Sequence, residues 1–170
     1  MIDTYLNYLH EGRLDDIKKH QDAVINIINT KPYIWLYHGT YPGRFEEIKK
    51  NGLLANKHGS GFTAGLGDER LHSTRKKHIS YTSYKRYSRA YTGKTTLSSP
   101  SSDPLLVRVP TEGLERASKN SSDLFKADEF VSIKNIPPKD IIFPDDPQYK
   151  KIEADNNYLV STMKLWSLYW

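Results

Sequence analysis

The sequence has no cysteine among its 170 residues. This absence excludes disulfide bonds, thiolate nucleophiles and every metal site that is ligated by cysteine. A chain without cysteine also fits a reducing compartment. We therefore expect a cytoplasmic protein, and no pattern in the sequence predicts a metal ion.

Long hydrophobic runs are missing as well. No apolar run approaches the roughly 20 residues that a membrane helix needs, and the first residues lack the basic and apolar regions of a signal peptide. Hydrophobic residues make up 37% of the chain and charged residues 26%, which is the balance of a globular protein. The length suits one domain with a small appendage, so we expect a monomer that does not enter a membrane.

Acidic residues are absent from one long stretch, residues 70–94. The net charge of the chain is +5, and this stretch carries the whole positive excess. Its basic residues are Arg70, Arg75, Lys76, Lys77, Lys85, Arg86, Arg89 and Lys94. A local positive field favours an anionic partner such as a nucleic acid or an acidic protein face. The alternative is an ordinary solvated loop.

Helical spacing dominates the first 31 residues. Apolar residues recur in steps of three and four before Gly12 and again from Leu14 to Ile28, which predicts two helices separated at the glycine. The second helix is expected to lie along the core or against a partner. Lys31-Pro32 ends the pattern, so we divide the chain into a helical segment at residues 1–31 and a domain at residues 32–170.

Strand patterns follow in the larger domain. The runs "YIWLYH", "HISYTS" and "PLLVRVP" are rich in aromatic and β-branched residues, and "DEFVSIKNIPPKDIIF" reads as two short strands separated by Pro137-Pro138. A short helix is expected after the first strand, with Thr40 as its cap, Pro42 in its first turn and Gly52 at its end. The mixture predicts an α+β fold.

Other segments are less regular. Residues 55–77 contain four glycines among polar residues, which is typical of a long functional loop. Residues 84–91 read as one or two helical turns, and the aromatic tail from Tyr158 to Trp170 is expected to pack on the body of the domain.

Three of these segments together resemble a known family. "YHGTYPGRFEEIKKNGL", "YTSYKRYSRAY" and "DEFVSIKNIPPKDI" are similar to the motifs of the ADP-ribosyltransferase superfamily, in the histidine-tyrosine-glutamate branch that includes the catalytic domains of diphtheria toxin and of poly-ADP-ribose polymerases. The likeness covers residues 35–143. It implies an ADP-ribosyltransferase-like split β-sheet core with flanking helices and an N-terminal helical appendage.

The resemblance also implies an activity. A mono-ADP-ribosyltransferase would cleave NAD and transfer ADP-ribose to a macromolecular acceptor, as a bacterial toxin or a phage effector acting in the cytoplasm of an infected or targeted host cell. NAD is then a substrate, and no metal ion is implied. The alternatives left open are a catalytically inactive module that binds NAD or nucleic acid, and a virion-associated interaction protein.

The residues of the NAD site follow from the matched motifs. By resemblance, His38 bonds the adenosine ribose hydroxyls, and Gly39 with Thr40 forms the wall that the nicotinamide amide approaches, since glycine has no side chain in the way. Tyr81 and Tyr91 would enclose the planar nicotinamide ring. Tyr87 replaces Tyr91 if the short helix is phased differently.

Glu129 is the expected catalytic carboxylate, together with Tyr81 and His38. Loss of nicotinamide leaves a cation-like ribosyl group, and a fixed carboxylate on the neighbouring hydroxyl stabilises the charge as it develops. Ala127 stands where arginine-modifying relatives carry Glu or Gln, which disfavours an arginine acceptor. The residues expected to bind the acceptor are Arg75, Lys76, Lys77, Arg86 and Arg89.

Overall fold

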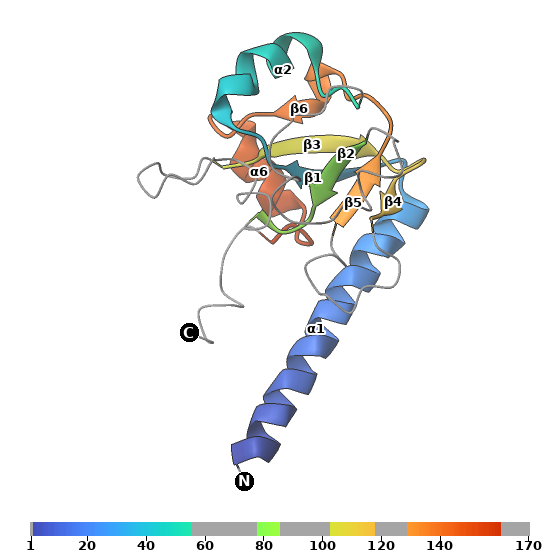
Figure 1. Ribbon diagram of the computed structural model, residues 1–170, viewed down its shortest axis with the longest axis vertical. Coiled ribbons are helices and arrows are strands. Elements are labelled where there is room, and N and C mark those ends of the chain that lie inside the picture. Colours follow the sequence, from blue (N-terminus) through green and yellow to red (C-terminus); the bar gives the residue numbers. More distant parts are fainter. Residues whose placement is uncertain (1, 56–77, 86–102, 118–128, 161–170) are drawn as a thin grey trace, which may run out of the picture.

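The computed structural model of the chain describes residues 2–55, 78–85, 103–117 and 129–160, with side chains described from residue 15 onward (Figure 1). Its core is a six-stranded antiparallel sheet in the order β4-β5-β2-β1-β3-β6. The strands are β1 (Tyr33–His38), β2 (Ile79–Thr82), β3 (Leu105–Pro110), β4 (Glu115–Arg116), β5 (Glu129–Ser132) and β6 (Ile141–Ile142). The helices are α1 (Ile2–Thr30), α2 (Phe45–Asn51) and α6 (Gln148–Asp155). The predicted α+β class is confirmed.

The sheet is weakly joined at its centre. β1 and β2 share one register pair, Tyr37 with Thr82, whereas β1 and β3 share six pairs and β2 and β5 share four. Figure 1 shows β2 crossing the line of β1 rather than running along it. The β4-β5-β2 half and the β1-β3-β6 half therefore meet at a single paired position, which we call the β1–β2 junction.

The prediction of two N-terminal helices is wrong, because α1 runs unbroken through Gly12. A glycine inside a helix costs only about 1 kcal/mol relative to alanine, which the helix around it can offset. In Figure 1 the N-terminal half of α1 projects away from the sheet. The C-terminal half packs on the core, where Val24 is fully buried. No helix in the described part of the chain is long and apolar enough to cross a membrane.

The segment after β1 turns sharply into α2. Pro42 opens a 3-10 turn (Pro42–Arg44) that leads into the helix, so the expected place of this proline is confirmed. Thr40 is not the cap: Tyr41 is the N-cap residue of the 3-10 turn, and neither this turn nor α2 has a side-chain cap hydrogen bond. Gly52 ends the helix as predicted, with a φ of 75° that favours glycine.

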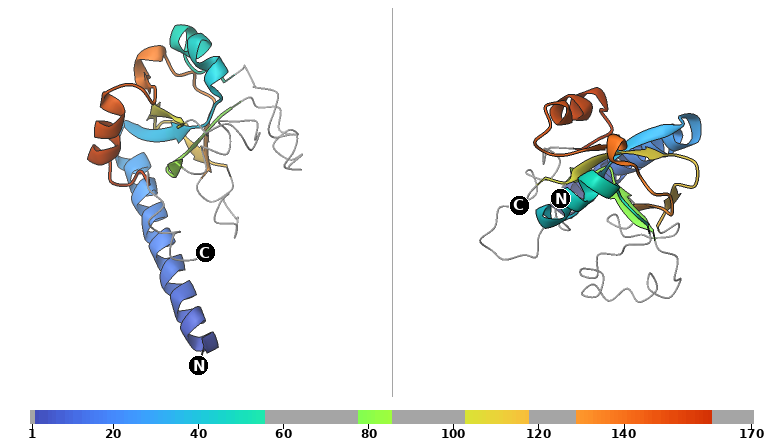
Figure 2. Two further views of the ribbon diagram at one scale, coloured as in Figure 1. Left: turned by 90° about the vertical axis from the view of Figure 1, so that its left-hand side faces the viewer. Right: turned by 90° about the horizontal axis from the view of Figure 1, so that it is seen from above.

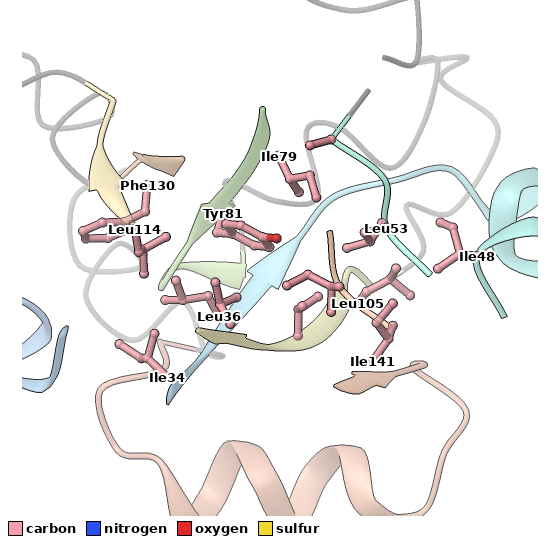
Figure 3. Close-up of a cluster of buried hydrophobic side chains, with 14 of the residues drawn as sticks. Ile34, Leu36, Ile48, Leu53, Ile79, Tyr81, Leu105, Leu114, Phe130 and Ile141 are labelled. Atoms are coloured by element: carbon pink, nitrogen blue, oxygen red, sulfur yellow. The ribbon is translucent and has the colours of Figure 1, made fainter. Parts of the chain in front are cut away.

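Alternation along the strands sorts the side chains onto two faces. One face carries the main hydrophobic core, which includes Leu36, Tyr81 and Phe130 (Figure 3). The other face carries a smaller cluster in which Tyr37 and Leu106 pack against Tyr149 of α6. Figure 2 shows α6 covering this second face of the sheet.

The expected loop at residues 55–77, the expected helical turns at residues 84–91 and the aromatic tail lie largely outside the described part of the chain. Residues 56–77, 86–102, 118–128 and 161–170 lie outside the described part of the chain. The start of the tail does pack on the body, because Leu159 is buried and Val160 forms a parallel bridge with Tyr84. The strands expected from "YIWLYH", "HISYTS", "PLLVRVP" and the segment around Pro137-Pro138 are all present.

Candidate functional site

His38 and Tyr81 lie together at the β1–β2 junction. The pairing of Tyr37 with Thr82 puts His38 across from Tyr81 in the antiparallel register. The centroids of their rings are 5.9 Å apart and the rings are tilted by 59°. Two residues that are 43 positions apart in the sequence thus lie side by side at this junction.

The main chain fixes the imidazole of His38. Its Nδ1 lies 2.9 Å from the carbonyl oxygen of Ser80, and since a carbonyl only accepts, Nδ1 carries the proton. Burial lowers the pKa of His38, and the nearby charge of Arg44 lowers it further against the effect of the Ser80 carbonyl. The neutral imidazole is therefore favoured, with Nε2 as a hydrogen-bond acceptor.

Tyr81 is buried more deeply than a ring that must stack on a ligand would require. Its side chain is only 2% exposed and belongs to the main core (Figure 3). Among the described residues its hydroxyl group has no hydrogen-bond partner, and burial raises its pKa. Such a hydroxyl costs about 1–3 kcal/mol unless a further group bonds it.

Gly39 and Thr40 follow His38 directly. Gly39 is partly buried and Thr40 is only 5% exposed. The described glycines with positive φ are Gly52 and Gly113, so Gly39 does not need a left-handed backbone. Its use in a ligand wall would rest on the missing side chain alone.

Glu129 lies one strand further along and does not face His38. It is the first residue of β5 and pairs with Thr82, the last residue of β2. Residues directly opposite each other share a face of the sheet, and neighbours in a strand alternate. Glu129 therefore shares the face of Thr82 and Tyr37, whereas His38 and Tyr81 lie on the other face. Its main chain is about 10 Å from β1, which is two interstrand spacings.

The other expected site residues fall outside the described part of the chain. These are Tyr87, Tyr91, Arg75, Lys76, Lys77, Arg86 and Arg89. Of the eight basic residues in the 70–94 stretch, Lys85 is described, and it does not add to a cationic surface. Its side chain is 9% exposed and paired with two carboxylates.

Sequence reasoning missed the network around that lysine. Lys85 Nζ lies 2.8 Å from Glu153 Oε1 and 3.3 Å from Asp103 Oδ2. The Tyr37 hydroxyl donates to the same Glu153 oxygen at 2.9 Å. We call these four residues the Lys85 network. No local signal could have revealed it, because its members are separated by up to 116 positions.

Burial has a clear effect on the tyrosine of this network. Burial raises the pKa of Tyr37 first, and the charge of Glu153 and its hydrogen bond raise it further. Tyr37 therefore stays neutral and acts as a donor. Tyr37 also pairs with Thr82 in the sheet. The Lys85 network therefore stabilises the β1–β2 junction on the face of the sheet opposite His38.

Comparisons with known proteins add no assignment: no family model, curated protein or solved structure matches the chain. Within the described ranges, no group of three or more His, Cys, Asp or Glu residues could hold a metal ion.

Proposed function

We propose that the protein is a mono-ADP-ribosyltransferase that binds NAD at the β1–β2 junction. The observation that carries the proposal is the contact of His38 with Tyr81, 5.9 Å between ring centroids, at the place where the two halves of the sheet meet. Both residues belong to the motifs that resemble the family, in segments that are far apart in the sequence.

The sheet supports the finer fold expectation as well. An ADP-ribosyltransferase-like core is expected to have a split sheet, and the single register pair between β1 and β2 supports a division there. Each half is held by longer pairing of its own. A ligand at the junction would contact the ends of strands from both halves.

The protonation of His38 at Nδ1 is compatible with a hydrogen bond to a ribose hydroxyl. With Nδ1 held by the Ser80 carbonyl, Nε2 would accept a hydrogen bond from a ribose hydroxyl of the substrate. The imidazole does not need to titrate for this role. The Tyr81 hydroxyl, which has no hydrogen-bond partner among the described residues, would gain one from the same ligand if the ring shifts on binding.

The reaction would break the bond between the nicotinamide nitrogen and the anomeric carbon of the ribose. The electron pair of that bond leaves with nicotinamide, an acceptor nucleophile forms the new bond to the anomeric carbon, and the acceptor loses a proton to solvent. Glu129 would hold the ribose 2′-hydroxyl and stabilise the positive charge that develops, an effect of about 10² to 10³ in rate for one such group. Because Glu129 begins β5 beside the end of β2, its carboxylate would reach the ribose around the strand end.

The acceptor would be a nucleic acid or an acidic protein face. The test is to incubate the protein with labelled NAD in a bacterial lysate and then to digest with RNase, DNase or protease. The digestion that removes the label identifies the acceptor class. Labelling that is unaffected by salt and by reversing the charges of Arg75, Lys76 and Lys77 would contradict a role for the basic stretch.

A second candidate is a catalytically inactive module that binds NAD or nucleic acid. The burial of Tyr81, 2% exposed, and the position of Glu129 on the opposite face favour it. The two candidates differ in one product, because an inactive module would bind NAD without releasing nicotinamide.

A further inference from the structure

A groove lies at the opposite end of β1 from His38. It has a volume of about 430 Å³ and forms where the end of α1, the start of β1, β3 and the segment after α6 come together. Tyr33 and His38 are five residues apart in an extended strand, or about 17 Å. The groove is therefore distinct from the candidate NAD site, and its role does not depend on the proposed function.

Aromatic residues form part of the lining of the groove. Its polar and aromatic lining residues are Lys31, Tyr33, Trp35, Arg108, Asn156 and Tyr158. Tyr33 is 41% exposed, and among the described residues only Tyr41 and Ile133 are other large apolar side chains with such exposure. The Tyr158 hydroxyl accepts a hydrogen bond of 3.0 Å from the main-chain nitrogen of Trp35. This bond holds one aromatic wall in place before any ligand arrives.

Two basic residues, Lys31 and Arg108, also line the groove. The Arg108 guanidinium lies 4.0 Å from the centroid of the Tyr33 ring, and its side chain is 43% exposed. Asp140 offsets part of its charge at a distance of 3.3 Å. Lys31 is exposed at the end of α1. None of the described residues that line the groove is acidic, so the groove has a net positive charge.

The backbone around these cations is fixed. The main-chain nitrogen of Thr111 donates to the Pro32 carbonyl at 3.0 Å, and the Thr111 hydroxyl donates to the Lys31 carbonyl. The register pairs Trp35 with Arg108, which puts their side chains on one face of the sheet. A ligand would therefore meet a preformed surface, which lowers the entropy that binding costs.

We propose that this groove binds a nucleotide, either free or as one unit of a single strand. Nucleobases stack on aromatic rings and on guanidinium planes. Lys31 would meet the phosphate, with Arg108, whose charge is shared with Asp140, beside it. The volume lies within the range of about 300–1,000 Å³ that is usual for small-molecule sites. Asn156 offers an amide for the base edge.

The test measures binding of adenosine monophosphate and of a fluorescent ten-nucleotide single strand to the full chain by calorimetry and anisotropy. Tyr33→Ala should weaken binding by about 5- to 150-fold, the range for one lost stack, whereas Tyr33→Phe keeps the ring and should bind as the parent does. Lys31→Gln should weaken binding and make it less dependent on salt. Lys150→Gln, an exposed lysine on α6 outside the groove, is the matched charge control.

Comparing the affinities of the two ligands distinguishes a site for a free nucleotide from a site for a single-stranded nucleic acid. A strand that binds more tightly than the mononucleotide, with both weakened by Tyr33→Ala, indicates a single-stranded nucleic acid; equal affinity indicates a free nucleotide. Binding that His38→Ala abolishes and Tyr33→Ala leaves unchanged would overturn the proposal, because the nucleotide would then occupy the candidate NAD site. Absence of binding of either ligand at millimolar concentration would overturn it too.

Discussion

Replacing Glu153 with glutamine tests how much the Lys85 network contributes to the free energy of unfolding. In the parent, the Lys85 side chain is 9% exposed, the Glu153 side chain is 12% exposed, and Lys85 Nζ lies 2.8 Å from Glu153 Oε1. Glu153→Gln removes the nearer negative charge and leaves the lysine with Asp103, at 3.3 Å and 35% exposed. Removing one partner of a buried pair costs about 3–5 kcal/mol, because the other charge stays buried without full compensation.

The size of this loss makes it easy to measure. A domain is stable by only about 5–15 kcal/mol, and for this length 1 kcal/mol shifts the melting temperature by about 2–4 °C. Glu153→Gln should therefore lower the midpoint by about 6–20 °C in thermal unfolding followed by circular dichroism. Lys85→Met should lower it similarly.

The double variant decides whether the two residues act together. Lys85→Met with Glu153→Gln removes both charges, so it should be more stable than the sum of the single losses predicts, by at least about 1 kcal/mol. Lys134→Met is the surface control, since its partner Glu112 is 91% exposed, and it should leave the midpoint unchanged. Single variants that lie within about 0.5 kcal/mol of the parent would refute the reasoning.

Three further changes test separate parts of the fold. Gly52→Ala forces a non-glycine residue to φ 75° against the Ile136 carbonyl, so the free energy of unfolding in urea should fall by at least about 1–3 kcal/mol; an unchanged midpoint would contradict the assigned helix end. Burial lowers the pKa of His20 below its usual 6.5, so stability is present above pH 6.5 and is lost as the pH falls through the folded-state pKa. His20→Gln should therefore lose less stability than the parent between pH 8 and pH 5, and identical pH profiles would count against this. Tyr81→Phe removes a buried hydroxyl without a described partner and should raise the free energy of unfolding by up to about 1–3 kcal/mol; a loss of more than about 1 kcal/mol would reveal a hydrogen bond to that hydroxyl.

Local patterns predicted the strands well. β1 begins and ends where "YIWLYH" does, because the proline at residue 32 and the glycine at residue 39 limit this aromatic run to a length that is typical of a strand. The end of α2 was also predictable, since Gly52 readily adopts the positive φ that the chain takes where this helix stops.

Long-range geometry was harder to predict. The motifs assigned His38, Tyr81 and Glu129 to one site, but they carried no information on the register of β5, which pairs Glu129 with Thr82. A shift of one residue in register would move Glu129 to the face of His38. Likewise, nothing in the local sequence distinguishes Lys85 from the other basic residues of the 70–94 stretch, because its burial depends on contacts with α6.

The helical appendage shows the limit of local propensity. Gly12 lowers helix propensity at one position, which made a break the natural expectation. The structure instead continues α1 to Thr30, and its last turns bury Val24 in the main core. Tertiary packing at one end therefore anchors a helix whose other end projects from the sheet (Figure 1).

The most direct test of the proposed activity is the release of nicotinamide from NAD by the purified protein, measured with and without lysate as the source of acceptor. The account predicts release by the parent, a loss of about 10² to 10³ in rate for Glu129→Gln, and the parent rate for Glu115→Gln, the exposed glutamate on the neighbouring strand β4. Retention of the parent rate by Glu129→Gln, or binding of NAD without any nicotinamide release, would contradict it.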